Sequence, residues 1–144
     1  MASVEKIYPA AQSTVISAQE GAGTQTFDVG DLVKFDSSGQ VVVATAGVIH
    51  GIARQDATGT QATKLEVELI DPNAIYCARY KAAATAQALV GDILDFTFTI
   101  GAHTLDEGSA TTDVYCVGLD NRDVVTTSGG RLLFRFLGTL FTGI

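Results

Sequence analysis

Apolar and polar residues alternate in short runs along most of this chain, and the runs end at Gly, Asn, Asp or Ser. In the run 64–70, for example, aliphatic residues alternate with a lysine and two glutamates. A period of two residues is typical of β-strands with one buried face. The pattern predicts strands at 31–36, 40–44, 48–54, 64–70, 74–80, 92–100, 113–119 and 131–137, and the alanine-rich run 81–89 is the only helical candidate. We therefore expect an all-β fold.

Three of these runs occur twice. The run 29–35, VGDLVKF, returns at 90–96 as VGDILDF; 50–56, HGIARQD, is matched by 117–123, VGLDNRD; and 64–69, KLEVEL, is matched by 131–136, RLLFRF. The second and third pairs share one spacing of 67 residues, whereas the first pair is 61 residues apart. The second copy is therefore expected to carry its additional residues between positions 96 and 118.

A glycine followed by an aspartate opens each copy. Gly30 and Gly91 can supply the positive φ of a tight turn, and Asp31 and Asp92 can bond the main chain just beyond it. We expect these four residues to be structural turns and not a pair of catalytic carboxylates. The repeat predicts a small β-barrel or sandwich with two pseudo-repeated halves, about 29–70 and 90–137. Chance similarity between short strands rich in valine and glycine is the alternative.

The first 26 residues differ in composition from the rest. They are rich in Ala, Ser, Thr, Gln and Gly, and their apolar pairs are Ile7-Tyr8 and Val15-Ile16. We expect 1–26 to form an extended N-terminal arm that ends in a strand near 14–17, and 27–144 to form a single β-domain.

Charge and composition exclude several classes of protein. The formal net charge is −7 with only nine Lys and Arg residues, which argues against nucleic-acid binding. No run approaches the roughly 18 apolar residues of a membrane span, and the N-terminus lacks the pattern of a signal peptide, so we expect synthesis in the cytoplasm without membrane contact. Cys77 and Cys116 lie in apolar runs and are expected to be buried free thiols, with a disulfide as the less favoured alternative.

Residue patterns for chemistry are scarce. His50 and His103 have no Cys or carboxylate at metal-ligand spacing and are expected to be structural or exposed. Two acidic clusters lack the calcium-loop pattern and are expected to be solvated loop faces: Asp120, Arg122 and Asp123, and Asp106 with Glu107. We expect neither an enzyme nor a cofactor or metal site.

The last strand breaks the pattern of its counterpart. Where Glu66 and Glu68 are expected to face water in the first copy, the second copy has Leu133 and, further on, Leu137, so this strand is apolar on both faces. A partner surface is therefore expected there, and we predict a homotrimer interface. Its residues are Leu133, Arg135, Leu137, Leu140, Phe141 and Ile144, with Ile7 and Tyr8 of the arm as further contacts.

The ordered motifs resemble a known family. The runs GDLVKF, GQVV and GIA in the first copy, and VGD, GAHTLD, VGLDNRD and GRLLFRF in the second, are similar to the trimeric head decoration (cement) proteins of tailed bacteriophages over roughly residues 27–137. The resemblance implies a β-tulip domain that assembles as a homotrimer. It also implies binding to the major capsid protein on the outer surface of the virion, at local three-fold positions, where neighbouring capsomers are stapled together. It carries over no catalytic residues.

Two other classes of protein share parts of this pattern. Gly-Asp boxes also occur in cradle-loop barrel transcription factors, but those usually need a basic surface, and this chain is acidic. The alternative that remains is a small β-barrel module that binds a carbohydrate or other small ligand, for which Tyr76 and Tyr80 are the best stacking residues in a chain without Trp.

Overall fold

The structure is a computed structural model of the chain, and it describes residues 3–9, 13–45, 47–81, 87–107, 113–123 and 129–137. Its fold is all-β, as expected. The strands are β1 (Val4–Tyr8), β2 (Val15–Gln19), β3 (Leu32–Phe35), β4 (Val41–Val43), β5 (Gly51–Ala53), β6 (Lys64–Leu69), β7 (Ile75–Tyr80), β8 (Ile93–Thr97), β9 (Thr104–Asp106), β10 (Val114–Leu119) and β11 (Arg131–Phe136).

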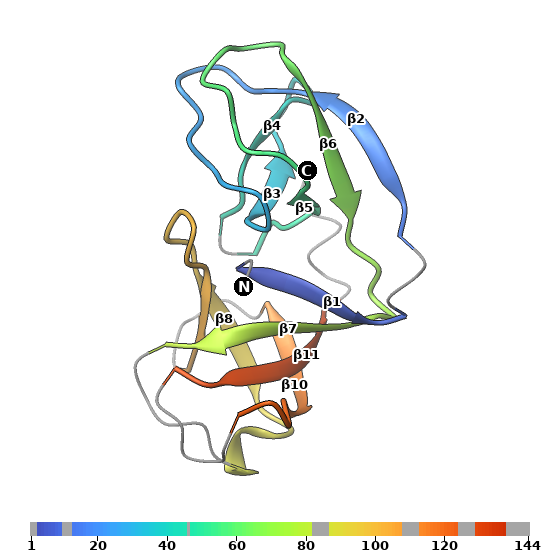
Figure 1. The fold of residues 1–144 in the computed structure, drawn as a ribbon, viewed down its shortest axis with the longest axis vertical. Coiled ribbons are helices and arrows are strands. Elements are labelled where there is room, and N and C mark those ends of the chain that lie inside the picture. The colour runs from blue at the N-terminus through green and yellow to red at the C-terminus, as the bar shows by residue number, and fades with distance from the viewer. Residues whose placement is uncertain are drawn as a thin grey trace.

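The strands form two sheets that lie one above the other in Figure 1, with β1 between them. The first half of the fold is the sheet β2-β6-β5-β3-β4, and the second half is β7-β11-β10-β8-β9 with β1 added to one edge of β7. The second half closes into a barrel because the end of β7 pairs in parallel with β9, Tyr80 opposite Leu105. The first half closes in the same manner at one position, where Glu20 forms a parallel bridge with Val41.

The two halves have the same topology, and their hydrogen bonds show which residues correspond. The Gly30 N–H donates to the Ala53 carbonyl at 2.8 Å, and the Gly91 N–H donates to the Cys116 carbonyl at 2.9 Å. Gly30 and Gly91 have φ values of 90° and 96°, so both are the positive-φ turn residues expected from the sequence. The strands β2 to β6 thus correspond in order to β7 to β11.

One of the three sequence matches is wrong in register. The pairing of 64–69 with 131–136 holds, since Val67 and Phe134 occupy the same position in their ladders. Gly51, however, lies opposite Val33 and Leu69, and the residue with the same neighbours in the second half is Val114, not Gly118. Gly118 lies instead at an irregularity of β10, where the register with β11 shifts. The shared spacing in the sequence therefore did not mark a shared structural position at this site.

The N-terminal segment is extended, as expected, but its described strands are built into both halves. β1 pairs with β7 and places Val4 in the core, and β2 pairs with β6 along its whole length. The segment 1–26 is therefore not an arm held apart from the sheets. Two further expectations need adjustment: β9 lies in a region predicted to be loop, and the described part of 81–89 contains only a short 3₁₀ turn, Gln87–Leu89.

The core has two parts. The smaller cluster fills the first half with Phe27, Val33, Val41, Ala53, Leu65 and Val67. The larger cluster fills the second half and continues between the halves, where Leu32 and Ile52 of the first half join Val4 of β1 and the aromatic group Tyr76, Phe96, Phe134 and Phe136. Burial of this continuous apolar surface holds the two halves together.

Two buried carboxylates add polar contacts across the same boundary. Asp31 of the first half accepts hydrogen bonds from the Ser3 hydroxyl at 2.6 Å and from the Gly101 N–H at 2.9 Å. Asp113 of the second half accepts from the Gly47 N–H at 3.0 Å. Each half thus binds a loop of the other through a carboxylate with no exposed surface.

The aspartates of the two turns differ in structure. Asp31 bonds back to the Asp28 N–H at 3.0 Å, rather than to the main chain beyond it, and is fully buried. Asp92 is exposed, and its carboxylate has no hydrogen-bond partner among the described residues. The same motif therefore ties the two halves together in one copy and forms only a surface turn in the other.

Candidate interaction surface

The outer face of the second half, on β11 and its neighbours, contains most of the residues predicted to meet a partner. Alternation along β11 places Leu132, Phe134 and Phe136 in the core, whereas Leu133, Arg135 and Leu137 face outward with partial or full exposure. The expected division of this strand into two faces is confirmed. Leu140, Phe141 and Ile144 lie outside the described residues.

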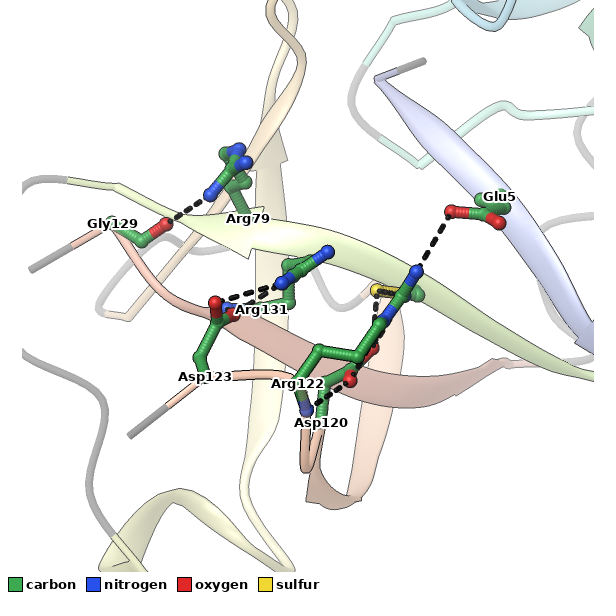
Figure 2. Close-up of polar contacts among 8 residues, drawn as sticks. Glu5, Arg79, Asp120, Arg122, Asp123, Gly129 and Arg131 are labelled. Carbon is green, nitrogen blue, oxygen red and sulfur yellow. Dashed lines mark hydrogen bonds and ion pairs between the residues drawn. The ribbon is translucent and has the colours of Figure 1, made fainter. Parts of the chain in front are cut away.

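One end of this face is charged and internally paired, as Figure 2 shows. The Arg131 guanidinium donates to both oxygens of Asp123 at 2.8 Å, and these bonds lower the pKa of Asp123 to about 2. Arg79 on β7 donates to the Gly129 carbonyl at 3.1 Å. The predicted acidic loop is therefore held by ion pairs with its own chain.

Asp120 and Arg122 continue this network toward β1. The Arg122 guanidinium donates from Nε to both Asp120 oxygens at 2.9 and 3.0 Å, and it lies 3.7 Å from Glu5. The bonds from Arg122 hold the pKa of Asp120 well below its usual range. Beneath them, burial first and then the hydrogen bond to Asp120 raise the pKa of the Cys77 thiol to about 12. Within the described ranges, no group of three His, Cys, Asp or Glu side chains is arranged to hold a metal ion.

The other end of the face carries exposed apolar side chains in one line across the strands. Ile93 of β8 lies opposite Tyr115 of β10, and Tyr115 lies opposite Arg135 of β11. Tyr8 of β1 lies near the same line. The β7–β11 pairing ends at Tyr76 and Phe134, the next residues of the two strands are Ile75 and Arg135, and Tyr8 is opposite Ile75 just past an irregularity of register. Tyr8, Ile93 and Tyr115 are 68%, 54% and 42% exposed. We call Tyr8, Ile93, Tyr115 and Arg135 the outer row.

Arg135 is the charged member of the outer row, and its contacts within the chain are weak. Its Nη2 atom lies 3.4 Å from the Pro72 carbonyl and 3.5 Å from the Asn73 side-chain oxygen. It has no carboxylate partner among the described residues, whereas Arg54 and Arg131 each have one and Arg122 has two. Arg135 is exposed to solvent, so its charge is not buried without a partner.

The face carries two shallow grooves, one beside the outer row and one at the charged end. The groove of about 330 Å³ beside Arg135 is lined by Pro72, Asn73, Tyr115, Arg135, Phe136 and Leu137. The groove at the charged end, of about 350 Å³, is lined by Ile7 of β1 and Leu133 of β11 together with Asp120 and Arg122. The structure therefore brings Ile7, Tyr8, Leu133, Arg135 and Leu137 onto one face, although they come from opposite ends of the chain.

The equivalent line in the first half is covered. The residues at the positions of Ile93, Tyr115 and Arg135 are Leu32, Ile52 and Glu68. Leu32 and Ile52 are packed in the core cluster that includes Val4 of β1. Glu68, expected to face water, is buried and accepts from Arg54 at 2.9 Å. The same sheet face is thus buried in one half of the molecule and exposed in the other.

Sequence reasoning missed Ile93 and Tyr115 as surface residues. The alternation along each strand could have predicted their exposure. Ile93 precedes the buried Leu94 and Phe96, and Tyr115 lies between the buried Val114 and Cys116, so both point to the opposite face of the sheet.

The remaining expectations concern histidines, cysteines and tyrosines. His50 and His103 each accept a main-chain N–H of β3 on Nδ1, from Phe35 at 2.9 Å and from Leu32 at 3.1 Å. Cys77 and Cys116 are buried and free, as predicted. Tyr76 and Tyr80 are buried, and the Tyr80 hydroxyl donates to Glu107, so they do not provide the stacking surface that the alternative ligand-binding module would need.

Comparisons with known proteins give one structural likeness. No protein-family model matches the chain, and no curated protein matches it. The fold is similar to that of the N base of the head fiber protein gp8.5 of bacteriophage phi29, with a TM-score of 0.52 and 14% sequence identity. The match covers 89% of this chain and 96% of that one. In the described part of the chain, no helix is long and apolar enough to cross a membrane.

Proposed function

We propose that this chain is a structural, non-enzymatic protein of a bacteriophage virion. It binds the major capsid protein on the outer capsid surface as a homotrimer at local three-fold positions, and it stabilises neighbouring capsomers. The observation that supports the virion role most directly is the fold likeness to a phage head fiber base, which extends over nearly the whole of both chains. The motif resemblance to head decoration proteins over residues 27–137 supports the same role.

The exposed outer row supports self-association. Tyr8, Ile93 and Tyr115 are large residues that are 42–68% exposed, so burying the remainder of each contributes part of the roughly 1.5–3 kcal/mol of full burial. Tyrosine and arginine are also the residue types enriched at the centres of protein interfaces. A closed three-fold ring buries such a surface on every subunit and leaves none exposed to drive further growth.

The experiment that tests this function separates attachment from stabilisation. The purified protein is mixed with expanded and with precursor capsids, and co-sedimentation is followed by thermal disruption of the loaded capsids. We expect binding to expanded capsids only and a higher disruption temperature. Binding without a change in disruption temperature would contradict cementing and leave a head-attached base, and no binding to either capsid would contradict the function as a whole.

A further inference from the structure

The surface of this chain carries a second exposed apolar site that differs from the outer row in charge. Val29 and Ile100 are 52% and 43% exposed. They lie where the two halves meet, because Gly101, next to Ile100, donates its N–H to Asp31 of the first half. The Val29 N–H donates to the Asp56 carboxylate at 2.8 Å, and a Cβ on Gly101 would lie 2.7 Å from an Asp28 oxygen, so these segments are in contact. We call Asp28, Val29, Asp56 and Ile100 the junction patch.

The two sites together account for most of the exposed large apolar residues in the described part of the chain. Tyr8, Ile93 and Tyr115 belong to the outer row, Val29 and Ile100 belong to the junction patch, and Val15 lies apart. Their charges are opposite. The outer row contains Arg135, with Asp92 beside Ile93 at its far end, whereas the junction patch contains two exposed aspartates. Lys6 and Arg54 line a groove with Val29, and Arg54 is already paired with Glu68.

The two sites come from different parts of the fold. The outer row lies on β1, β8, β10 and β11, and the junction patch lies on the loops before β3, after β5 and after β8. A contact between an outer row and a junction patch is therefore heterologous, with each subunit donating one surface and accepting the other. Contacts of this kind close into rings when the rotation between subunits allows it.

We propose that the outer row of one subunit docks on the junction patch of a second copy of this chain. Arg135 then gains the carboxylate that it lacks within its own chain, from Asp28 of the neighbour, and the apolar residues on both sides are buried together. The exposed row of the second half is in this way covered by a neighbouring subunit, as Leu32 and Ile52 are covered within one chain. This inference rests on the homotrimer of the proposed function and identifies the two surfaces that form it.

Charge reversal tests the pairing. Arg135→Asp and Asp28→Arg each place like charges across the contact, and the double variant restores opposite charges with their positions exchanged. Both side chains are exposed, and Asp28 uses only main-chain atoms in its hydrogen bonds among the described residues. Mass is measured by light scattering over a concentration series, and folding is checked by far-ultraviolet circular dichroism.

Each single variant should raise the dissociation constant at least about tenfold, since close charge pairs at interfaces commonly contribute this much. The double variant should recover most of that loss. Two control variants change the net charge by the same amounts as the two test variants: Arg79→Asp on the charged end of the same face and Glu66→Arg on β6. Both controls should leave the mass of the oligomer unchanged.

The outcomes separate this inference from the function on which it rests. If the wild type and both single variants are trimers, the pairing of the two surfaces is overturned but the homotrimer is not. The same holds if the double variant does not recover trimer formation, even where a single variant aggregates. A wild type that stays monomeric at all concentrations would overturn the homotrimer, and this inference with it. Capsid binding, measured separately, tests the attachment function whichever result is obtained.

Discussion

The two Gly-Asp turns provide a matched pair for testing what the buried carboxylate contributes to stability. We predict that Asp31→Ala destabilises the protein strongly and that Asp92→Ala does not. The two residues follow equivalent glycines, and the main-chain hydrogen bonds of their turns are the same. They differ in surroundings, because Asp31 is fully buried at the boundary between the halves and Asp92 is exposed.

The magnitude follows from the bonds that Asp31 accepts. Removing its carboxylate leaves three donors without their acceptor: the Ser3 hydroxyl, the Asp28 N–H and the Gly101 N–H. A buried donor left unsatisfied costs about 1–3 kcal/mol, and the Asp28 and Gly101 groups are only partly buried, so we expect a total loss of about 3–6 kcal/mol. For a chain of this length that corresponds to a fall in melting temperature of about 10–20 °C. Asp92→Ala should change stability by no more than about 0.5 kcal/mol.

Urea unfolding monitored by circular dichroism measures both variants against the wild type. Should Asp31→Ala fail to fold, Ser3→Ala provides a milder test, because it removes one donor to Asp31 and the acceptor of the His103 N–H, with an expected loss of about 1–3 kcal/mol. Equal effects of Asp31→Ala and Asp92→Ala, or a loss below about 1 kcal/mol for Asp31→Ala, would refute the argument that this carboxylate holds the two halves together.

Three further predictions concern other sites. Burial lowers the pKa values of His50 and His103, so as the pH falls the unfolded chain binds protons before the folded chain does. The free energy of unfolding should therefore decrease as the pH is lowered from 7.5 to below the unfolded histidine pKa of about 6.5. Urea midpoints across that range measure this dependence, and a flat profile would contradict it. Gly51→Ala should cost about 1–3 kcal/mol, because its Cβ would lie 2.5 Å from a side-chain methyl and 2.8 Å from a main-chain carbonyl, and calorimetry showing an unchanged melting temperature would disprove the clash. Cys77, buried and with its pKa raised to about 12, should react with a thiol reagent at pH 8 only after denaturant is added; rapid labelling of the native protein would show that the site opens.

Much of the fold could be predicted from local patterns. The two-residue alternation predicted all-β structure because a strand with one buried face needs apolar residues at every second position. The Gly-Asp turns and the match of 64–69 with 131–136 were also predicted, since both depend on short-range rules of turn geometry and strand periodicity. The buried state of both cysteines followed from their place in apolar runs.

Tertiary structure alone decided which of two equivalent surfaces is exposed. Leu32 and Ile93 follow the same turn and hold the same ladder position, yet one is in the core and the other is 54% exposed. The difference arises because the N-terminal strand β1 and the second half lie against the first half, whereas Ile93 and Tyr115 of the second half stay exposed in the described structure.

The segment 1–26 and the histidines show the same limit. The polar composition of the segment predicted extended structure, but not that β1 pairs with β7, some 70 residues later in the chain. His103 meets β3 only because the loop before β9 crosses to the other half. Strand periodicity is a property of neighbours in sequence and could be predicted, whereas the contact between the halves depends on the position of both in space, and that determines which residues of this protein are available to a partner.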